Sequence, residues 1–156
     1  MRKGRRIALD VGRVRIGVAI CDPEAIVSTP LNPILRGSDL KNAIAEVFSI
    51  AEEFESLELY VGEPLSLDGS ITASTIDARE FAIELSGVVS SPVRMIDERL
   101  TTVSAAAKLR SSGQNAKTSK GLIDSASAVE ILDIALNQEK LSGQAPGILV
   151  ADRIGA

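Results

Sequence analysis

The predicted β-sheet begins in residues 7–21, which have the sequence IALDVGRVRIGVAIC. Two apolar runs rich in β-branched side chains, 7–10 and 16–21, flank a short segment in which Gly12 permits a tight turn. This pattern predicts an antiparallel hairpin of two central strands. The next extended segment, 26–35, contains two prolines, and we expect an edge or irregular strand because proline cannot donate a backbone hydrogen bond.

Helices and strands alternate in the rest of the chain. Apolar residues recur at helical spacing in 39–54, where Ser38 is the expected N-cap, and in 71–85. Short strands are predicted at 57–61 and 93–96, and two further helices at 101–111 and 119–138. A strand-helix-strand crossover requires parallel pairing, whereas the hairpin is antiparallel. We therefore predict an α/β fold with a mixed five-stranded sheet flanked by helices.

The domain organisation follows from the length of 156 residues, which suits one domain with its own core. We assign this single domain to residues 1–138. The segment 139–156 contains Gly143, Pro146, Gly147 and Gly155, and we expect it to be a flexible C-terminal tail.

From the composition we expect a cytoplasmic protein that does not span a membrane. Hydrophobic residues make up 45% of the chain, yet no apolar run approaches the roughly 20 residues needed to cross a bilayer. The basic start MRKGRR resembles an export signal, but Asp10, Arg13 and Arg15 interrupt the apolar stretch behind it. Cys21 is the only cysteine, so an intramolecular disulfide is impossible and a reducing compartment is expected.

The absence of histidine restricts the possible chemistry. It excludes Ser-His-Asp and Cys-His nucleophilic sites, imidazole bases and the common zinc sites. Any catalysis must use carboxylates, hydroxyls, lysines or a metal. The net charge of −4 argues against a protein that coats nucleic acid without specificity. Arginine and lysine nevertheless gather near the start and in the later half, so a basic face is compatible with the acidic total.

Three acidic positions suggest one site. Asp10 ends a predicted buried strand, where it either accepts hydrogen bonds from the Gly12 turn or binds a cation. Asp124 lies on the same helical stripe as the apolar residues four, seven and eleven positions later, so it should point toward the sheet. Alternatively, an acid in a first helical turn can interact favourably with the helix dipole. The triplet Asp97-Glu98-Arg99 follows a strand at the edge where open α/β sheets bind ligands, although charges at strand ends are usually solvated.

These carboxylates fit a magnesium site. Magnesium prefers oxygen ligands and keeps several waters, so two or three carboxylates leave room for a substrate phosphate. Two such ions can activate a water molecule and stabilise the leaving oxygen of an in-line displacement. The sequence therefore predicts a metal-dependent phosphodiesterase site that needs no histidine.

Four motifs extend this interpretation. They are LDVGRVRIGVA (9–19), VGEPL (61–65) with DGS (68–70), DERLTT (97–102), and KG (120–121) with DSASA (124–128). In this order, over about residues 5–138, they resemble the YqgF family of pre-16S ribosomal RNA nucleases, which are related in fold to Holliday-junction resolvases. The resemblance implies a ribonuclease H-like fold and metal-dependent hydrolysis of nucleic-acid phosphodiesters that matures the 5′ end of precursor 16S ribosomal RNA.

The resemblance also implies roles for individual residues. The family's catalytic and metal-binding acids correspond to Asp10, Glu98 and Asp124, which would hold Mg²⁺ or Mn²⁺, with two ions expected. Asp97 is the rival of Glu98, and because neighbours on a strand face opposite sides, only one of them should join the cluster. Residues expected to contact substrate phosphates are Arg15, Arg99 and Lys120. Ordinary surface or ion-pair roles remain the alternative for these three.

One residue departs from the family pattern. Glu63 stands between glycine and proline, where the family usually has an apolar residue. This places an additional acid near the expected cleft, where it could alter metal or substrate binding.

Several partners and functions remain open at this stage. Precursor ribosomal RNA and ribosome assembly intermediates are the expected partners. Four-way DNA junctions are an alternative substrate, and a non-catalytic RNA-binding module in ribosome assembly is a further alternative. The protein is expected to be a monomer or a homodimer. The Asp10 turn also resembles the phosphate-binding start of actin-like ATPases and sugar kinases, but these enzymes need two related domains and the chain is too short for both.

Overall fold

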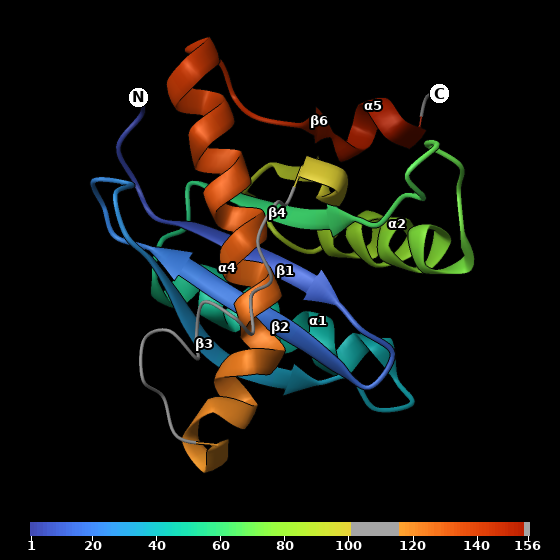
Figure 1. The fold of residues 1–156 in the computed structure, drawn as a ribbon. Helices are drawn as coiled ribbons and strands as arrows, with labels where there is room; N and C mark the ends of the chain where they lie inside the picture. The colour runs from blue at the N-terminus through green and yellow to red at the C-terminus, as the bar shows by residue number, and fades with distance from the viewer. Residues whose placement is uncertain (101–115, 155–156) are drawn as a thin grey trace.

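Six strands form one mixed sheet in the order β3-β2-β1-β4-β5-β6 (Figure 1). The computed structural model describes the backbone of residues 1–100 and 116–154, and the side chains of 1–99 and 125–152. The strands are β1 (Arg6–Val11), β2 (Arg15–Cys21), β3 (Ser28–Leu35), β4 (Glu58–Glu63), β5 (Val93–Asp97) and β6 (Ile148–Leu149).

Strand pairing confirms the mixed sheet expected from the sequence. Strands β1 and β2 are antiparallel, with Ile7 opposite Ile20, and β3 continues this antiparallel part as the proline-containing edge strand. Strands β1, β4 and β5 are parallel to one another. The carboxyl ends of these three strands therefore meet at one edge of the sheet, together with the turn between β1 and β2.

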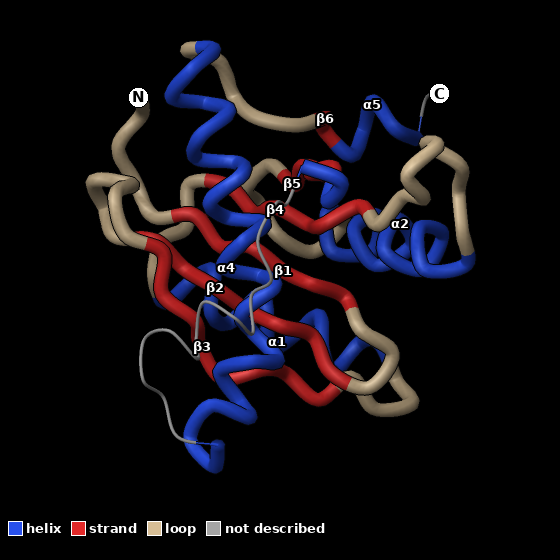
Figure 2. Tube along the Cα trace, viewed as in Figure 1, coloured by secondary structure: helices blue, strands red, loops and turns tan. Residues whose placement is uncertain are grey.

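Helices cover both faces of the sheet. Helices α1 (Leu40–Glu53), α2 (Ala73–Ser86) and α5 (Val150–Ile154) lie on one face, and the long helix α4 (Ala116–Ser142) crosses the other (Figure 2). A short 3₁₀ helix, η1 (Glu98–Leu100), follows β5. The helix predicted at 101–111 lies outside the described residues. None of the helices that the structure describes combines the length and apolarity that a bilayer crossing requires.

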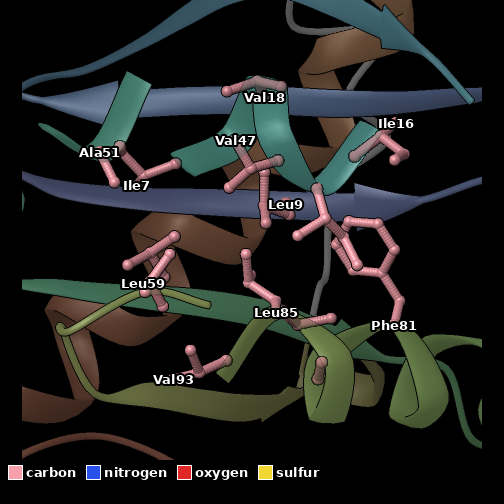
Figure 3. Packing of buried hydrophobic residues seen from close by; sticks show 14 of the residues in the cluster. Ile7, Leu9, Ile16, Val18, Val47, Ala51, Leu59, Phe81, Leu85 and Val93 are labelled. Carbon is pink, nitrogen blue, oxygen red and sulfur yellow. The ribbon is translucent and has the colours of Figure 1, made fainter. Parts of the chain in front are cut away.

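The core consists of two layers because successive side chains of a strand point to opposite faces. Ile7 and Leu9 of β1 pack with Phe81 of α2 in the larger layer, between the sheet and helices α1 and α2 (Figure 3). Ala8 between them belongs to the smaller layer, together with Ile131 of α4. This alternation decides on which face each side chain at the carboxyl edge lies.

Two helix starts differ slightly from the expected positions. The N-cap of α1 is Asp39 rather than Ser38, and its carboxylate accepts a hydrogen bond from Lys41 N at 2.9 Å. Helix α2 begins after Thr72, which forms a capping box with Thr75, because Ile71 is still paired with Leu65 in an isolated bridge. In both caps a side-chain oxygen accepts a hydrogen bond from a backbone N–H of the first helical turn, which is the common arrangement at helix N-termini.

The C-terminal segment is a correction to the sequence-based prediction. We expected a flexible tail from residue 139, but α4 continues to Ser142, and β6 pairs antiparallel with β5 to make a six-stranded sheet. Gly147 has a positive φ of 67° and passes so close to Met95 O that a Cβ atom would overlap it. Val150 is 2% exposed and joins the larger core layer. The glycine that suggested a tail therefore allows close packing instead.

Candidate active site

Asp10 lies at the carboxyl edge on the α4 side of the sheet. It is the second-last residue of β1 and pairs with Gly17 of β2, and Ala8 two positions earlier belongs to the α4-side core. Burial raises the pKa of the Asp10 carboxyl group above its ordinary value. Among the described side chains, no arginine or lysine forms an ion pair with it. Such a carboxylate is stable in its charged form only when a cation or hydrogen-bond donors compensate it.

Glu98 occupies the space above Gly62 of β4. A Cβ atom on Gly62 would lie 2.9 Å from Glu98 Cδ and 2.5 Å from Ile131 Cδ1. The parallel register pairs Leu9 with Val61, so Asp10 and Gly62 are the next neighbours on β1 and β4. The absence of a side chain at Gly62 therefore allows the Glu98 carboxyl group to lie between β4 and α4, on the same face as Asp10.

The electrostatics of Glu98 show the influence of Asp10 on its carboxyl group. Burial, followed by the negative charges of Asp10 and Asp97, raises the pKa of Glu98 to about 7. A nearby like charge disfavours ionisation, and burial adds to this effect. Asp10 and Glu98 thus form a partly buried acidic pair at the carboxyl edge. We call this the edge pair.

Asp97 points away from the edge pair. Met95 lies in the larger core layer and Ile96 in the smaller one, so the alternation directs Asp97 to the face opposite Glu98. The Asp97 carboxylate accepts hydrogen bonds from Arg99 N at 2.9 Å and from Arg99 Nη2 at 2.6 Å. Of the two adjacent acids, Glu98 is the one that the structure brings beside Asp10, and Asp97 holds Arg99.

Glu63 also lies on the far face. Its side chain is 1% exposed and accepts a hydrogen bond from Arg79 Nε of α2 at 2.7 Å. Because Gly62 faces α4, its neighbour Glu63 faces α2. The additional acid therefore does not join the edge pair, and its charge is compensated by an arginine within the fold.

Asp124 and Lys120 belong to α4, but their side chains lie outside the described residues. The stripe predicted to share the orientation of Asp124 is present, because Ala128, Ile131 and Ala135 are all 0% exposed. Among the side chains that the structure does describe, no group of three His, Cys, Asp or Glu residues could hold a metal ion. The third acid of the predicted cluster thus stays a prediction.

Two residues that position the site were not identified from the sequence. Ser125, directly after Asp124, accepts from Val18 N at 3.1 Å and donates to Leu31 O at 2.6 Å, which fixes α4 on β2 and β3. Gly62 provides the space for Glu98. A small residue within an apolar strand is a weak signal, but it can mark a close approach of another chain segment.

Two of the predicted phosphate contacts, Arg15 and Arg99, lie at the same edge. Arg15 is exposed at the start of β2, beside the end of β1. Arg99 follows β5, is exposed, and forms an ion pair with Asp97 at 2.6 Å. The edge pair is therefore accompanied by two arginines that the structure places near the surface.

Comparisons with known proteins identify related sequences. A family model described as "RuvX: Holliday junction resolvase" matches residues 4–138. A "Putative pre-16S rRNA nuclease" from Streptomyces avermitilis is 46% identical over 148 residues, which is 94% of each chain. A protein of the same name from Leifsonia xyli subsp. xyli is 45% identical over 157 residues and covers 99% of each chain. The family resemblance seen in the four motifs is confirmed.

A solved structure supports the fold. "T. thermophilus RuvC in complex with Holliday junction substrate" superimposes with a TM-score of 0.58 at 12% sequence identity. The match covers 92% of the present chain and 99% of the other. Together with the observed mixed sheet, this similarity confirms a ribonuclease H-like fold.

Proposed function

Since this chain belongs to the RuvX family of Holliday junction resolvases, we propose that it is a divalent-metal-dependent endonuclease that hydrolyses nucleic-acid phosphodiester bonds. The observation that carries the proposal is the edge pair. Asp10 and Glu98 meet at the carboxyl edge of parallel strands, and the pKa of each carboxyl group is raised. Fold alone would not assign this activity, because one fold supports many functions.

The edge pair fits a divalent cation better than other ligands. Both side chains offer only oxygen donors, which Mg²⁺ and Mn²⁺ prefer, and the space above Gly62 leaves Glu98 next to Asp10. A cation would also compensate the two causes that raise the pKa of Glu98, burial of the charge and repulsion by the neighbouring acids. We infer that Asp10, Glu98 and Asp124 hold two ions, with Asp124 as the third ligand. When bound, such ions supply activation of the attacking water and charge stabilisation at the leaving oxygen.

The protein's own residues prepare the site for a phosphate backbone. Asp10 at the end of β1 and Glu98 in the 3₁₀ helix after β5 would hold the cations from either side of β4. Asp97 fixes the backbone amide and the guanidinium of Arg99 at the carboxyl edge, with the guanidinium close to Gly69 of the loop after β4. We infer that Arg15, Arg99 and Lys120 contact phosphate groups, which would orient a nucleic acid without reading its sequence.

We propose that the substrate is precursor 16S ribosomal RNA and that the reaction matures its 5′ end in the cytoplasm, on ribosome assembly intermediates. The support comes from the names of relatives that are 46% and 45% identical and cover nearly the whole chain. A four-way DNA junction is a second candidate, favoured by the family description and by the fold shared with RuvC. Carboxylate-metal sites contact phosphates and do not by themselves distinguish RNA from DNA.

The experiment is a parallel cleavage assay. A precursor 16S RNA fragment and a synthetic four-way DNA junction are each incubated with the protein in Mg²⁺, in Mn²⁺ and in a chelator. We expect metal-dependent cleavage that favours the RNA. Asp10→Asn, Glu98→Gln and Asp124→Asn should abolish it, whereas Asp97→Asn should retain most of it. Glu52→Gln, an exposed position on α1, is the control.

Each outcome decides between the candidate functions. Cleavage of the junction alone would replace the RNA substrate by branched DNA. Cleavage that persists in folded Asp10→Asn and Asp124→Asn proteins would refute the carboxylate mechanism. RNA binding without cleavage in any metal would favour the non-catalytic RNA-binding module.

A further inference from the structure

The turn between β1 and β2 is bonded to Arg36, the residue after β3. Arg36, which directly follows β3, donates its backbone N–H to Val14 O at 2.9 Å. Its Nη1 also donates to Gly12 O at 3.1 Å. Gly12 N in turn donates to Arg15 O at 3.0 Å, which closes the four-residue turn. Arg36 therefore contacts both sides of the turn that connects Asp10 to β2.

Arg36 is itself fixed by an acid on α2. Its Nη1 and Nη2 atoms donate to Asp77 Oδ2 and Oδ1, each at 2.6 Å. The side chains are 17% and 31% exposed, so the pair is only partly accessible to water. The paired charges raise the pKa of Arg36 and lower the pKa of Asp77. Two parallel bonds between a planar guanidinium and a carboxylate define both distance and orientation.

The turn itself allows little displacement. A Cβ atom on Gly12 would lie 2.5 Å from Arg15 O, so only glycine permits this closure. Arg13 and Arg15 are both exposed, on either side of Val14. The positive charge of Arg13 also reaches Asp77 and contributes to its lowered pKa. Two cationic side chains are thus presented from one turn, three and five residues after Asp10.

We propose that Arg36 and Asp77 are positioning residues, which fix the β1–β2 turn so that Arg13 and Arg15 bind a nucleic-acid backbone beside the edge pair. The inference rests on the proposed function and assigns a backbone contact to Arg13. An ion pair on an exposed surface contributes little to stability. This pair differs because the same guanidinium also holds a backbone carbonyl of the turn, so its loss changes the position of the turn rather than a surface charge alone.

The test uses substitutions that keep charge or shape. Arg36→Lys keeps the positive charge but cannot hold both carboxylate oxygens and Gly12 O at once. Asp77→Asn keeps the shape and removes the charge. The matched control is Arg94→Lys, because Arg94 is 20% exposed and bonds Glu58 Oε2 through Nε at 2.8 Å, at the opposite end of the sheet. Arg13→Ala tests the phosphate contact, with exposed Lys41→Ala as its control.

Two measurements are independent of cleavage. Amide hydrogen exchange of residues 11–15 reports the order of the turn, and fluorescence anisotropy in a chelator gives the Kd for a labelled four-way DNA junction and an RNA hairpin. We expect faster exchange and roughly tenfold weaker binding for Arg36→Lys and Asp77→Asn, and neither change for Arg94→Lys. Arg13→Ala should leave hydrogen exchange unchanged. It should reduce the slope of log Kd against log salt concentration by about 1, as expected for the loss of one phosphate contact. Lys41→Ala should leave the slope unchanged.

The outcomes separate this inference from the proposed function. Unchanged exchange in both Arg36→Lys and Asp77→Asn, or faster exchange with unchanged Kd, would overturn the positioning role even if the wild-type protein cleaves. An unchanged salt slope in Arg13→Ala would overturn the phosphate contact. If the wild-type protein binds the probes but never cleaves, weaker binding by the variants would support the positioning role and refute the nuclease activity. A wild-type protein that binds neither probe would overturn both.

Discussion

Gly62→Ala tests the arrangement of the edge pair with one methyl group. The new Cβ would lie 2.5 Å from Ile131 Cδ1, 2.9 Å from Glu98 Cδ and 3.1 Å from Glu98 Cγ, whereas ordinary contacts begin at 3.4 Å. Glu98 Cδ must therefore move by about 0.5 Å, the difference between 3.4 and 2.9 Å, and Ile131 Cδ1 by about 0.9 Å, the difference between 3.4 and 2.5 Å. Stability and activity should respond to different parts of this change.

The cost in stability comes from the buried isoleucine. Overpacking a close-packed core costs about 1–3 kcal/mol, and replacing glycine within a strand returns about 0.5–1 kcal/mol. We expect the free energy of unfolding to fall by about 1–2 kcal/mol, which corresponds to a decrease in Tm of roughly 2–8 °C for a domain of this size. Glu98 contributes little to this cost because its carboxyl end can shift.

The cost in activity comes from the displaced carboxylate. A misplacement of about 1 Å in a catalytic group can cost about a hundredfold in rate, so a shift of half that size should reduce cleavage roughly tenfold or more. Cleavage of whichever nucleic acid the wild-type protein cuts best is measured at saturating Mg²⁺, and Tm is measured by calorimetry. Gly87→Ala is the control, because a Cβ there meets nothing closer than 3.5 Å and the backbone φ is −78°.

A double substitution distinguishes the two effects. Ile131→Val removes the Cδ1 atom that the new methyl group would meet, so Gly62→Ala/Ile131→Val should regain stability relative to Gly62→Ala. The coupling energy should be about 1 kcal/mol or more. Activity should stay low because Glu98 remains displaced. A Gly62→Ala protein that melts within about 2 °C of the wild type and cleaves at the wild-type rate would refute the packing of Glu98 over Gly62.

Three further predictions follow from the fold and the edge pair. In the metal-free protein the free energy of unfolding should fall by up to about 3 kcal/mol as the pH rises from about 4.5 to about 7. The reason is that the pKa of Glu98 is about 7 in the folded chain and 4.5 ordinarily. Urea titrations at several pH values should show no such decline for Glu98→Gln, and an equal decline in the variant would contradict the prediction. Added Mg²⁺ should raise the Tm of the wild type more than that of Asp10→Asn, and equal shifts by differential scanning fluorimetry would argue against a cation at Asp10. Deleting residues 143–156 should lower the free energy of unfolding by at least about 1.5 kcal/mol, because Val150 and the edge of β5 become exposed; an unchanged urea midpoint would show that β6 adds nothing.

The local patterns of the sequence determined most of the fold. The alternation of apolar residues around Gly12 predicted the hairpin, and the prolines of β3 predicted an edge strand, because both signals depend on hydrogen bonds between near neighbours. The C-terminal segment escaped this reasoning. Its contacts join Gly147 to Met95, which are far apart in sequence, and its apolar run is too short to show a period.

The candidate site divides in the same way. The sequence by itself determined that histidine cannot carry any catalysis, and its motifs indicated Asp10 and Glu98. Only the tertiary structure decided that Glu98 rather than Asp97 lies beside Asp10, that Glu63 pairs with Arg79 on the far face, and that Gly62 provides the space between β4 and α4. The physical reason is that the face on which a side chain lies at a sheet edge depends on the register of neighbouring strands and on the helix packed above them. Neither is a local property of the chain.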